Sequence, residues 1–374
     1  MNNEPSLTPA ARMQGLSAYA PPKPPGRIDL RLSGNEGQAP QADLLAALQR
    51  HAPEVFRQYP SAAELEAALA EPMGAAADRV LVTAGADDAL YRTCLAFLEP
   101  GREMVIPEPT FEMLDRYAAL AGGAIRRVQW PRGDYPLAEV LRSTSARTAL
   151  VTVVSPNSPT GAVATASDLR ELAERLPTAL ILLDAAYVDF ADEDLTGAAL
   201  ALPNALVLRT FSKAWGLAGL RVGYAIGRPQ VIRWLRAAGN PYAVSGPSLA
   251  LALACLRAGQ AHVGSFVQRI RTERQELFDL LRMLGAAPLP SQANFVFSEF
   301  DDAESVWRRL ATGGIAVRWF GEDPRLRKFL RITCPGNARD FERLCKALEN
   351  ALSGTRAAHD PNATISDTVN RAQE

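Results

Sequence analysis

Histidine is scarce in this chain of 374 residues, which contains only His51, His262 and His359. No two of them stand at the spacing of metal ligands, so the sequence argues against a histidine-based metal site. A hydrolase of the Ser–His–Asp kind would need one of them beside a strained G-x-S-x-G turn, and the sequence has no such turn. An enzyme of this composition has to work through lysine, arginine, tyrosine and carboxylates.

Cysteine pairs, net charge and long apolar runs are missing as well. The four cysteines are scattered with no CxxC pair, which fits unpaired core thiols in a reducing compartment. Forty basic and 41 acidic residues nearly cancel, with no long basic run, which argues against nucleic acid or an anionic membrane as a partner. Neither a secretory leader nor a run long enough to cross a bilayer is visible. We therefore expect a cytoplasmic protein that acts on small molecules.

The chain does contain a regular alternation of short apolar runs and amphipathic segments. Such alternation predicts crossover units and a mostly parallel sheet covered by helices on both faces. The expected strands are 79–85, 103–107, 124–130, 149–155, 179–187, 205–211 and 221–227. The expected helices between them are 87–98, 110–121, 166–176 and 213–219.

The pattern changes after about residue 229. It is mainly helical to about 285, and short strands with two helices follow, which predicts a small α+β domain. Those strands lie in 293–300, 314–320 and 328–334, and the helices at 302–312 and 338–352. We expect an N-terminal arm at 1–28, a small domain from 29–50 and 265–352, a large domain at 51–264, and a disordered tail at 353–374.

Polar residues follow several of the expected strands, where ligands bind in open α/β sheets. In "TAGADDAL" a helix is expected to start near Ala86 and Asp87, and a helix N-terminus suits a phosphate group. A carboxylate beside the phosphate would repel it, so Asp87 is expected to cap the helix while the backbone holds the phosphate. The alternative is a well-capped helix with no ligand. In "SPNSPTG" two prolines and a glycine display Asn157 rigidly at a strand end, although an asparagine in a turn is the plain alternative.

Two further stretches carry charge at the same edge. "LLDAAYVDF" places Asp184 at the end of the most apolar run, where a carboxylate needs a cationic partner. The alternative is that Asp184 only caps a helix. Tyr187, three residues further on, could reach the same site. "TFSKAWGLAGLRVGY" delivers Thr210, Ser212 and Lys213. A lysine there is either a surface residue or a desolvated amine suited to Schiff-base chemistry. The hydroxyls and the planar fork of Arg221 in the same stretch suit a phosphate and favour the second reading.

This inventory fits one ligand, a phosphorylated aldehyde on a cationic aromatic ring, which is pyridoxal phosphate. Lys213 would form the imine, and Asp184 would keep the pyridine nitrogen protonated so that the ring acts as an electron sink. The other assignments are Tyr187 and Asn157 at the ring hydroxyl, Arg221 at the phosphate and Phe111, after another strand, over the ring face.

The sequence resembles the fold-type I aminotransferases, and within them the histidinol-phosphate aminotransferase branch, over residues 15–350. The resemblance rests on "SPNSPTG", "DAAYVDF", "TFSKAWGLAGLRVGY", "SQANFVF" and "LRITC", in the family's order and at similar spacings. It implies a large domain with a mostly parallel seven-stranded sheet plus a small α+β domain, with pyridoxal 5'-phosphate as cofactor. Lys213, Asp184 and Tyr187 would be catalytic. The implied cofactor contacts are Ala86, Asp87, Phe111, Asn157, Asp184, Tyr187, Thr210, Ser212, Lys213 and Arg221.

The resemblance also implies a dimer and a substrate site. Tyr59 in "FRQYP" matches a tyrosine that such enzymes lend to the neighbouring subunit's cofactor phosphate, so the active unit would be a homodimer. Arg331 matches the arginine that grips a substrate α-carboxylate, and Arg318 the one that this branch aims at a substrate phosphate. Tyr19 and Asn35 sit where the family's N-terminal segment closes over the substrate.

Two departures from the branch concern the site's surroundings. Ala185 stands where the branch usually has glutamate, which is not a cofactor ligand. The usual Asn-Pro after Asn35 and Glu36 is also absent, so the entrance loop differs.

The expected reaction is transamination of histidinol phosphate with 2-oxoglutarate, which gives imidazole-acetol phosphate and glutamate in histidine biosynthesis. An aromatic or broad-specificity aminotransferase and a threonine-phosphate decarboxylase are the alternatives on the same scaffold. A regulator built on an inactive aminotransferase domain would carry an N-terminal DNA-binding module, and the sequence has only a proline-rich arm there.

Overall fold

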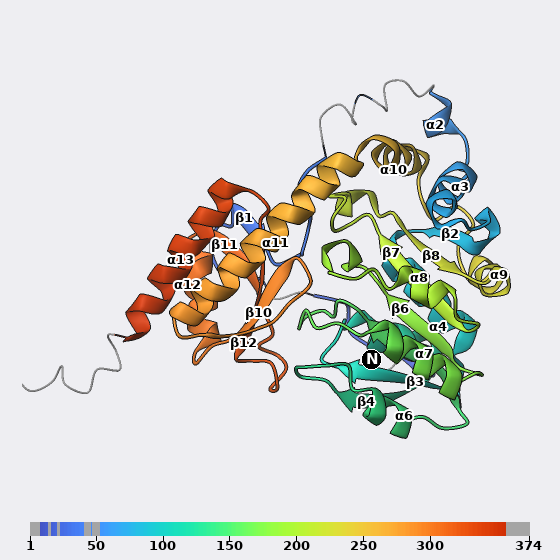
Figure 1. The fold of residues 1–374 in the computed structure, drawn as a ribbon, viewed down its shortest axis with the longest axis horizontal. Coiled ribbons are helices and arrows are strands. Elements are labelled where there is room, and N and C mark those ends of the chain that lie inside the picture. The colour runs from blue at the N-terminus through green and yellow to red at the C-terminus, as the bar shows by residue number, and fades with distance from the viewer. Residues whose placement is uncertain (1–7, 14–15, 21–22, 41–45, 47–52, 357–374) are drawn as a thin grey trace, which may run out of the picture.

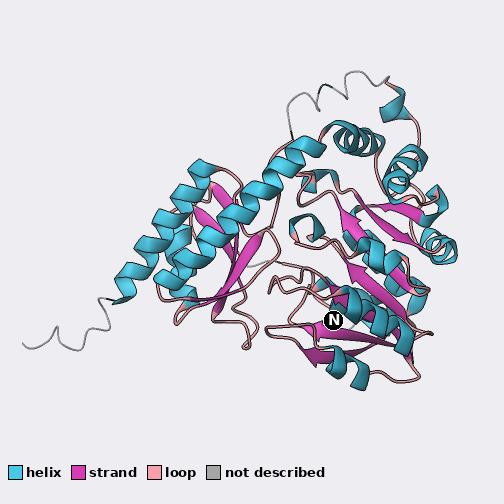
Figure 2. Ribbon diagram, in the orientation of Figure 1, coloured by secondary structure: helices cyan, strands magenta, loops and turns pink. Residues whose placement is uncertain are grey.

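Two β-sheets, each with its own helices, form two lobes of the molecule (Figure 1). This computed structural model describes residues 8–13, 16–20, 23–40, 46 and 53–356. The larger lobe holds the middle of the chain, and the smaller lobe joins a short N-terminal strand to the C-terminal quarter. Figure 2 shows helices packed along both faces of the larger sheet.

The larger sheet has seven strands in the order β2-β8-β7-β6-β5-β3-β4. Only β8 runs antiparallel to its neighbours, which confirms the predicted mostly parallel seven-stranded sheet. The two central strands β5 and β6 are buried along their whole length, as their unbroken apolar runs require. The strands are β2 (Val80–Thr83), β3 (Glu103–Glu108), β4 (Ala124–Gln129), β5 (Thr148–Val154), β6 (Leu180–Asp184), β7 (Ala205–Thr210) and β8 (Gly223–Gly227).

Most helices of this lobe follow the predicted alternation. The expected helices at 87–98, 110–121 and 166–176 correspond to α4, α5 and α7, whereas α6 and α8 are too short to give a periodic signal. The helices are α3 (Ala63–Ala70), α4 (Gly85–Phe97), α5 (Met113–Ala121), α6 (Leu137–Arg142), α7 (Ala166–Arg175), α8 (Thr196–Leu200), α9 (Pro229–Ala237) and α10 (Gly246–Ala258), with α2 (Glu54–Arg57) before them.

The predicted helix at 213–219 is wrong. The chain turns after β7 and forms only the 3-10 segment η5 (Ala218–Leu220). Gly216 has φ of +67°, and a Cβ on it would stand 1.8 Å from the carbonyl oxygen of Gln38. The N-terminal segment therefore packs directly on this turn, at a place that only glycine tolerates.

The smaller sheet has five strands in the order β1-β11-β12-β10-β9, antiparallel except where β1 pairs with β11. Its core includes Leu30, Leu277, Phe295, Ile332 and Leu344, so it gathers residues from the N-terminal segment and the C-terminal part. The elements are β1 (Leu30–Leu32), α11 (Gln260–Met283), β9 (Ala287–Leu289), β10 (Phe295–Glu299), α12 (Ala303–Thr312), β11 (Ile315–Trp319), β12 (Phe329–Thr333) and α13 (Ala338–Arg356).

The domain boundaries stay a prediction, and α11 runs across the expected boundary at 264/265. The disordered tail expected from 353 is wrong for its first residues, because α13 continues to Arg356. The rest of that tail, 357–374, and parts of the expected arm (1–7, 14–15 and 21–22) lie outside the described residues. Within the part of the chain that the structure describes, no helix is both long and apolar enough to cross a membrane.

Candidate active site

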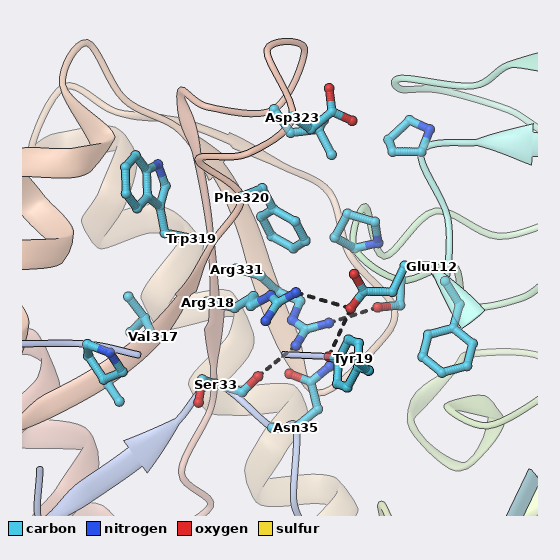
Figure 3. A pocket seen from close by; sticks show the side chains of 18 of the residues that line it. Tyr19, Ser33, Asn35, Glu112, Val317, Arg318, Trp319, Phe320, Asp323 and Arg331 are labelled. Carbon is cyan, nitrogen blue, oxygen red and sulfur yellow. Dashed lines mark hydrogen bonds and ion pairs between the residues drawn. The ribbon is translucent and has the colours of Figure 1, made fainter. Parts of the chain in front are cut away.

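A cavity of about 890 Å³ opens between the two lobes. The N-terminal arm, the loop from β3 to α5, and strands β11 and β12 line it, and Figure 3 shows their side chains converging on it. Seven of the residues singled out in the sequence lie in its lining: Tyr19, Asn35, Phe111, Tyr187, Lys213, Arg318 and Arg331.

Lys213 stands three residues beyond the end of β7 and lines this cavity. Its Nζ donates to the carbonyl oxygen of Gly34 at 3.1 Å and lies 5.5 Å from the centroid of the Tyr187 ring. A Cβ on Gly37 would stand 1.9 Å from the Lys213 carbonyl oxygen, so the segment after β1 also touches this lysine's backbone. The amine is therefore held between the two lobes, at the carboxyl edge of the larger sheet.

Asp184 ends β6 and is buried. Its Oδ1 accepts from the Ala186 backbone N–H at 3.0 Å, and none of the ion pairs among the described residues includes it. Burial raises the pKa of Asp184 to about 6, against the pull of that N–H and of Lys213. A buried acid of this kind is suited to a cationic partner such as a protonated ring nitrogen.

Tyr187 and Asn35 form a buried pair at the edge of the cavity. The Asn35 Nδ2 donates to the Tyr187 hydroxyl at 2.8 Å, and its Oδ1 accepts from Thr333 Oγ1 at 2.7 Å. Burial alone would raise the pKa of Tyr187, but Lys213, Arg331 and the Asn35 amide outweigh it, so this pKa lies below its ordinary value. The Tyr187 hydroxyl is thus a stronger hydrogen-bond donor than that of an ordinary tyrosine.

Asn157 is fully buried, and its amide is already in use. Its Nδ2 donates to the Pro109 carbonyl at 2.9 Å and to Thr160 Oγ1 at 2.8 Å, while its Oδ1 accepts from Thr110 Oγ1 at 2.7 Å. The contact with a ring hydroxyl therefore stays a prediction, and it requires one of these bonds to be exchanged. Phe111, in the same loop, packs on the core of the larger lobe and borders the cavity.

The ends of β2, β7 and β8 form a cradle of backbone and hydroxyl groups. Thr210 Oγ1 donates to Ser212 Oγ at 2.9 Å, and Arg221 Nη1 reaches that oxygen at 3.5 Å. A Cβ on Gly223 would stand 2.5 Å from the Ala86 nitrogen, and a Cβ on Gly85 would stand 2.6 Å from Arg221 Nη2. Glycine thus brings the first turn of α4 against the guanidinium, a grouping that suits a phosphate.

The capping expected of Asp87 is wrong. The helix begins at Gly85, and Asp88 is the residue whose Oδ2 accepts from the N-cap Ala84 N–H, at 3.0 Å. Asp87 instead pairs with Arg221, with 3.1 Å between Oδ2 and Nη2. The Asp87 carboxylate was expected at the helix cap, away from the cofactor phosphate. It lies instead on Arg221, the arginine expected to bind that phosphate.

Two arginines on neighbouring strands of the smaller sheet face the cavity. Arg318 on β11 and Arg331 on β12 are direct partners in the antiparallel register, and Figure 3 shows their side chains near each other in the pocket. Arg331 donates to Ser158 Oγ at 2.9 Å and to the Ser33 carbonyl at 2.7 Å, and its buried Nε has no partner. Burial lowers the pKa of Arg331. An unpartnered donor on a buried guanidinium suits an incoming carboxylate.

Glu112 is a functional candidate that sequence reasoning missed. Arg318 Nη2 and the Tyr19 hydroxyl both approach its Oε1, at 3.1 Å and 2.9 Å (Figure 3). Glu112 directly follows Phe111 in the sequence, and this adjacency is the signal that could have identified it. Ser33 and Ser158, which accept from Arg331, carried no signal in the sequence.

Tyr59 lies apart from this cavity. Its ring stacks on Tyr242 with the centroids 4.6 Å apart, and the residue is 82% exposed. Its expected role at a neighbouring subunit's site stays a prediction. Ala185, the departure from the branch pattern, is buried in the core of the larger lobe and does not line the cavity.

Comparison with known proteins gives the class of this enzyme. The family model for aminotransferase class I and II matches residues 29–348. The chain belongs to this family, and it is a fold-type I aminotransferase, as the motifs in the sequence predicted.

Relatives narrow the branch to that of the histidinol-phosphate aminotransferases. The chain is 32% identical to the histidinol-phosphate aminotransferase of Moorella thermoacetica over 90% of this chain and 91% of the relative. It is 33% identical to that of Pectobacterium atrosepticum over 89% and 93%. The solved histidinol-phosphate aminotransferase of Sinorhizobium meliloti, in complex with pyridoxal-5'-phosphate, superposes with a TM-score of 0.84 at 26% identity over 92% of this chain and 97% of that one.

Proposed function

We propose that this enzyme transfers the amino group of histidinol phosphate to 2-oxoglutarate, which gives imidazole-acetol phosphate and glutamate. The observation that carries this proposal is that Arg318 and Arg331, which are register partners on β11 and β12, line the same cavity as Lys213. Two guanidinium groups there match substrates that bring a phosphate or a carboxylate besides the reacting amine. The names of relatives that match along nine-tenths of their length support the same choice.

Pyridoxal phosphate fits the residues around the cavity. The cradle of Ala86, Thr210, Ser212 and Arg221 offers backbone N–H groups, hydroxyls and a guanidinium for its phosphate. The buried Asp184 lacks a cationic partner among the described residues, and it would hold the ring nitrogen. When bound, the cofactor supplies an aldehyde and an electron-withdrawing ring that stabilises charge at the substrate α-carbon.

The chain's own groups then divide the work of the reaction. Lys213 would hold the cofactor covalently, and its Nζ would move a proton to and from the substrate α-carbon. Tyr187, with its lowered pKa and its bond to Asn35, would donate a hydrogen bond to the oxygen of the ring hydroxyl. Phe111 limits water at one face of the cavity.

Two arginines position the substrates. Arg331 binds the α-carboxylate of glutamate or 2-oxoglutarate through its unpartnered Nε and through Nη1, which gives up its bond to Ser158. Arg318 takes the phosphate of histidinol phosphate, beside the hydroxyl of Tyr19. Asn35 fixes the segment from the N-terminal arm across the cavity, because its side chain joins Tyr187 to Thr333.

The active unit in this proposal is a homodimer, and its location is the cytoplasm. The exposed Tyr59, stacked on Tyr242, is available to a neighbouring subunit, and sedimentation equilibrium of the purified enzyme tests the dimer. All four cysteines, Cys94, Cys255, Cys334 and Cys345, are unpaired, which fits a reducing compartment.

Single-turnover spectroscopy tests the choice of substrate. One equivalent of histidinol phosphate, phenylalanine or threonine phosphate is added to the cofactor-loaded enzyme, and the visible absorption of the Lys213-bound cofactor is followed. Loss of that absorption with histidinol phosphate supports the proposal, whether or not phenylalanine gives a weaker response. A response to phenylalanine alone favours an aromatic aminotransferase, and carbon dioxide release from threonine phosphate favours the decarboxylase.

A further inference from the structure

Glu112 stands where a substrate anion is expected to bind. Its Oε1 accepts from both groups assigned to the substrate phosphate, Arg318 at 3.1 Å and the hydroxyl of Tyr19 at 2.9 Å (Figure 3). The three residues come from three parts of the chain, since Glu112 precedes α5, Arg318 lies on β11 and Tyr19 on the N-terminal arm. A carboxylate of the protein therefore already takes the donors that an incoming anion needs.

The remaining charges of the cavity make Glu112 distinctive. The lining holds six basic and four acidic side chains. The other three acids, Glu108, Asp115 and Asp323, are paired with Arg127 or Arg325. Glu112 is the acid whose partner is a substrate arginine, and its loss would raise the positive charge of that side of the cavity.

The two partners differ in their freedom to move. The Arg318 side chain is 12% exposed and lies 5.4 Å from the centroid of the Phe320 ring, whereas the Glu112 side chain is 52% exposed. Moving the carboxylate into water costs little because it is already half solvated. Leaving the arginine buried without a partner costs much more. An exchange at this site therefore moves Glu112 and keeps Arg318 in place.

We propose that Glu112 is a specificity-determining residue, a displaceable internal anion that lets one subsite accept both anionic and uncharged substrate groups. The part of this inference that concerns histidinol phosphate rests on the function proposed above. A phosphate or carboxylate replaces Glu112 on Arg318, and the glutamate turns to solvent. An uncharged group, such as an aromatic ring, packs beside an arginine that Glu112 keeps neutralised. The same pocket thus serves substrates of two classes at the cost of some affinity for the anionic one.

Replacing Glu112 by glutamine tests this exchange, because the amide keeps the size and loses the charge. In Glu112→Gln holoenzyme we expect the KM for histidinol phosphate to fall about 3- to 10-fold, the range of one partly exposed ion pair. We expect the KM for phenylalanine to rise over the same range, since an uncharged ring would then lie against an unpaired arginine. The opposite directions of the two changes separate this role from a general loss of structure.

The matched control is Glu139→Gln. Glu139 pairs with Arg142 on α6, and its side chain is also 52% exposed, but its arginine is 69% exposed and outside the cavity. We expect both KM values to stay unchanged in this variant. Equal shifts of both KM values in Glu112→Gln, or none, would overturn the proposal.

A binding measurement keeps the inference separate from the proposed function. Isothermal titration of the holoenzyme with inorganic phosphate needs no turnover, and Glu112→Gln is expected to bind phosphate about 3- to 10-fold more tightly than the wild type. The gain should vanish when Arg318→Ala is added. If histidinol phosphate is not a substrate but phosphate binding still tightens, the proposed function fails and the role of Glu112 stands. If phosphate affinity does not change, Glu112 is not an internal competitor.

Discussion

The candidate site has two parts, which we call the floor and the wall, and they are built in different ways. The floor lies at the carboxyl edge of the larger sheet, where Asp184 and Thr210 are buried at the ends of adjacent strands. The wall is made by Tyr19, Glu112 and Arg318, whose contacts join the arm and both lobes. The floor is fixed by backbone and by glycine contacts, whereas the wall depends on side chains that can exchange partners. Chemistry is therefore placed on the rigid part and substrate choice on the adjustable part.

An arginine–carboxylate pair occurs in each of the two parts. Arg221 and Asp87 in the floor, and Arg318 and Glu112 in the wall, each have 3.1 Å between Nη2 and the carboxylate oxygen. The side chains of the floor pair are 49% and 39% exposed, and those of the wall pair are 12% and 52% exposed. The wall arginine is the more buried of the two, so its partner should affect ligand affinity more strongly.

The largest effect is expected from Lys213→Ala in the floor. This variant should bind the cofactor without a covalent attachment and lose about 10³-fold or more in turnover, because it lacks both the anchoring amine and the group that moves the proton. Borohydride reduction followed by peptide mapping checks the attachment, with label expected at residue 213 of the wild type only. Lys346→Ala, an exposed lysine paired with Glu342 on α13, is the control. Turnover within tenfold of the wild type would mean that another residue is the base.

The second effect concerns Asp184, whose burial raises its pKa to about 6 from the ordinary 3.8. The folded protein holds the proton of Asp184 more tightly than the unfolded chain does, so protonation of Asp184 contributes to the free energy of unfolding. This contribution is complete below pH 3.8 and is lost as the pH rises through about 6. A shift of about two units corresponds to about 3 kcal/mol.

Asp184→Asn should therefore stabilise the cofactor-free protein at pH 8 by about 1–3 kcal/mol and leave it unchanged near pH 3.5. The same change should also lower turnover, though by less than Lys213→Ala does, since the amide cannot hold a protonated ring nitrogen. Urea unfolding at both pH values checks this, with the exposed Asp301→Asn as control. A loss of stability at pH 8 would show that the buried carboxylate is compensated in the folded protein.

The floor could be predicted from the sequence because its residues directly follow apolar runs. Asp184 and Lys213 stand at or just beyond the ends of β6 and β7, so locating the strands also located the charges. The helix expected at 213–219 failed because Gly216 packs against Gln38, a contact between distant segments that periodicity does not report. Such contacts depend on tertiary structure alone.

The wall could be predicted only in part. Arg318 and Tyr19 were found through the family resemblance, but Glu112 was not, because its partner Arg318 lies 206 positions away. Strand β1 was missed as well, since three residues give no periodic signal and its partner β11 begins at Ile315. The resemblance therefore supplied the residues with an expected family role and left out Glu112.

The smallest effect on turnover, and the one that tests the wall itself, is that of Arg318→Ala. We expect it to weaken histidinol phosphate by about 1.5–3 kcal/mol, the range for a lost charged hydrogen bond, with little change in turnover at saturation. Phenylalanine should lose less, because its ring makes no ion pair there and Glu112 becomes solvated once the arginine is gone. Steady-state kinetics with both substrates measures the difference, and Arg308→Ala, an exposed arginine paired with Glu304 on α12, is the control. An unchanged KM for histidinol phosphate would separate Arg318 from phosphate recognition and move that role to the floor.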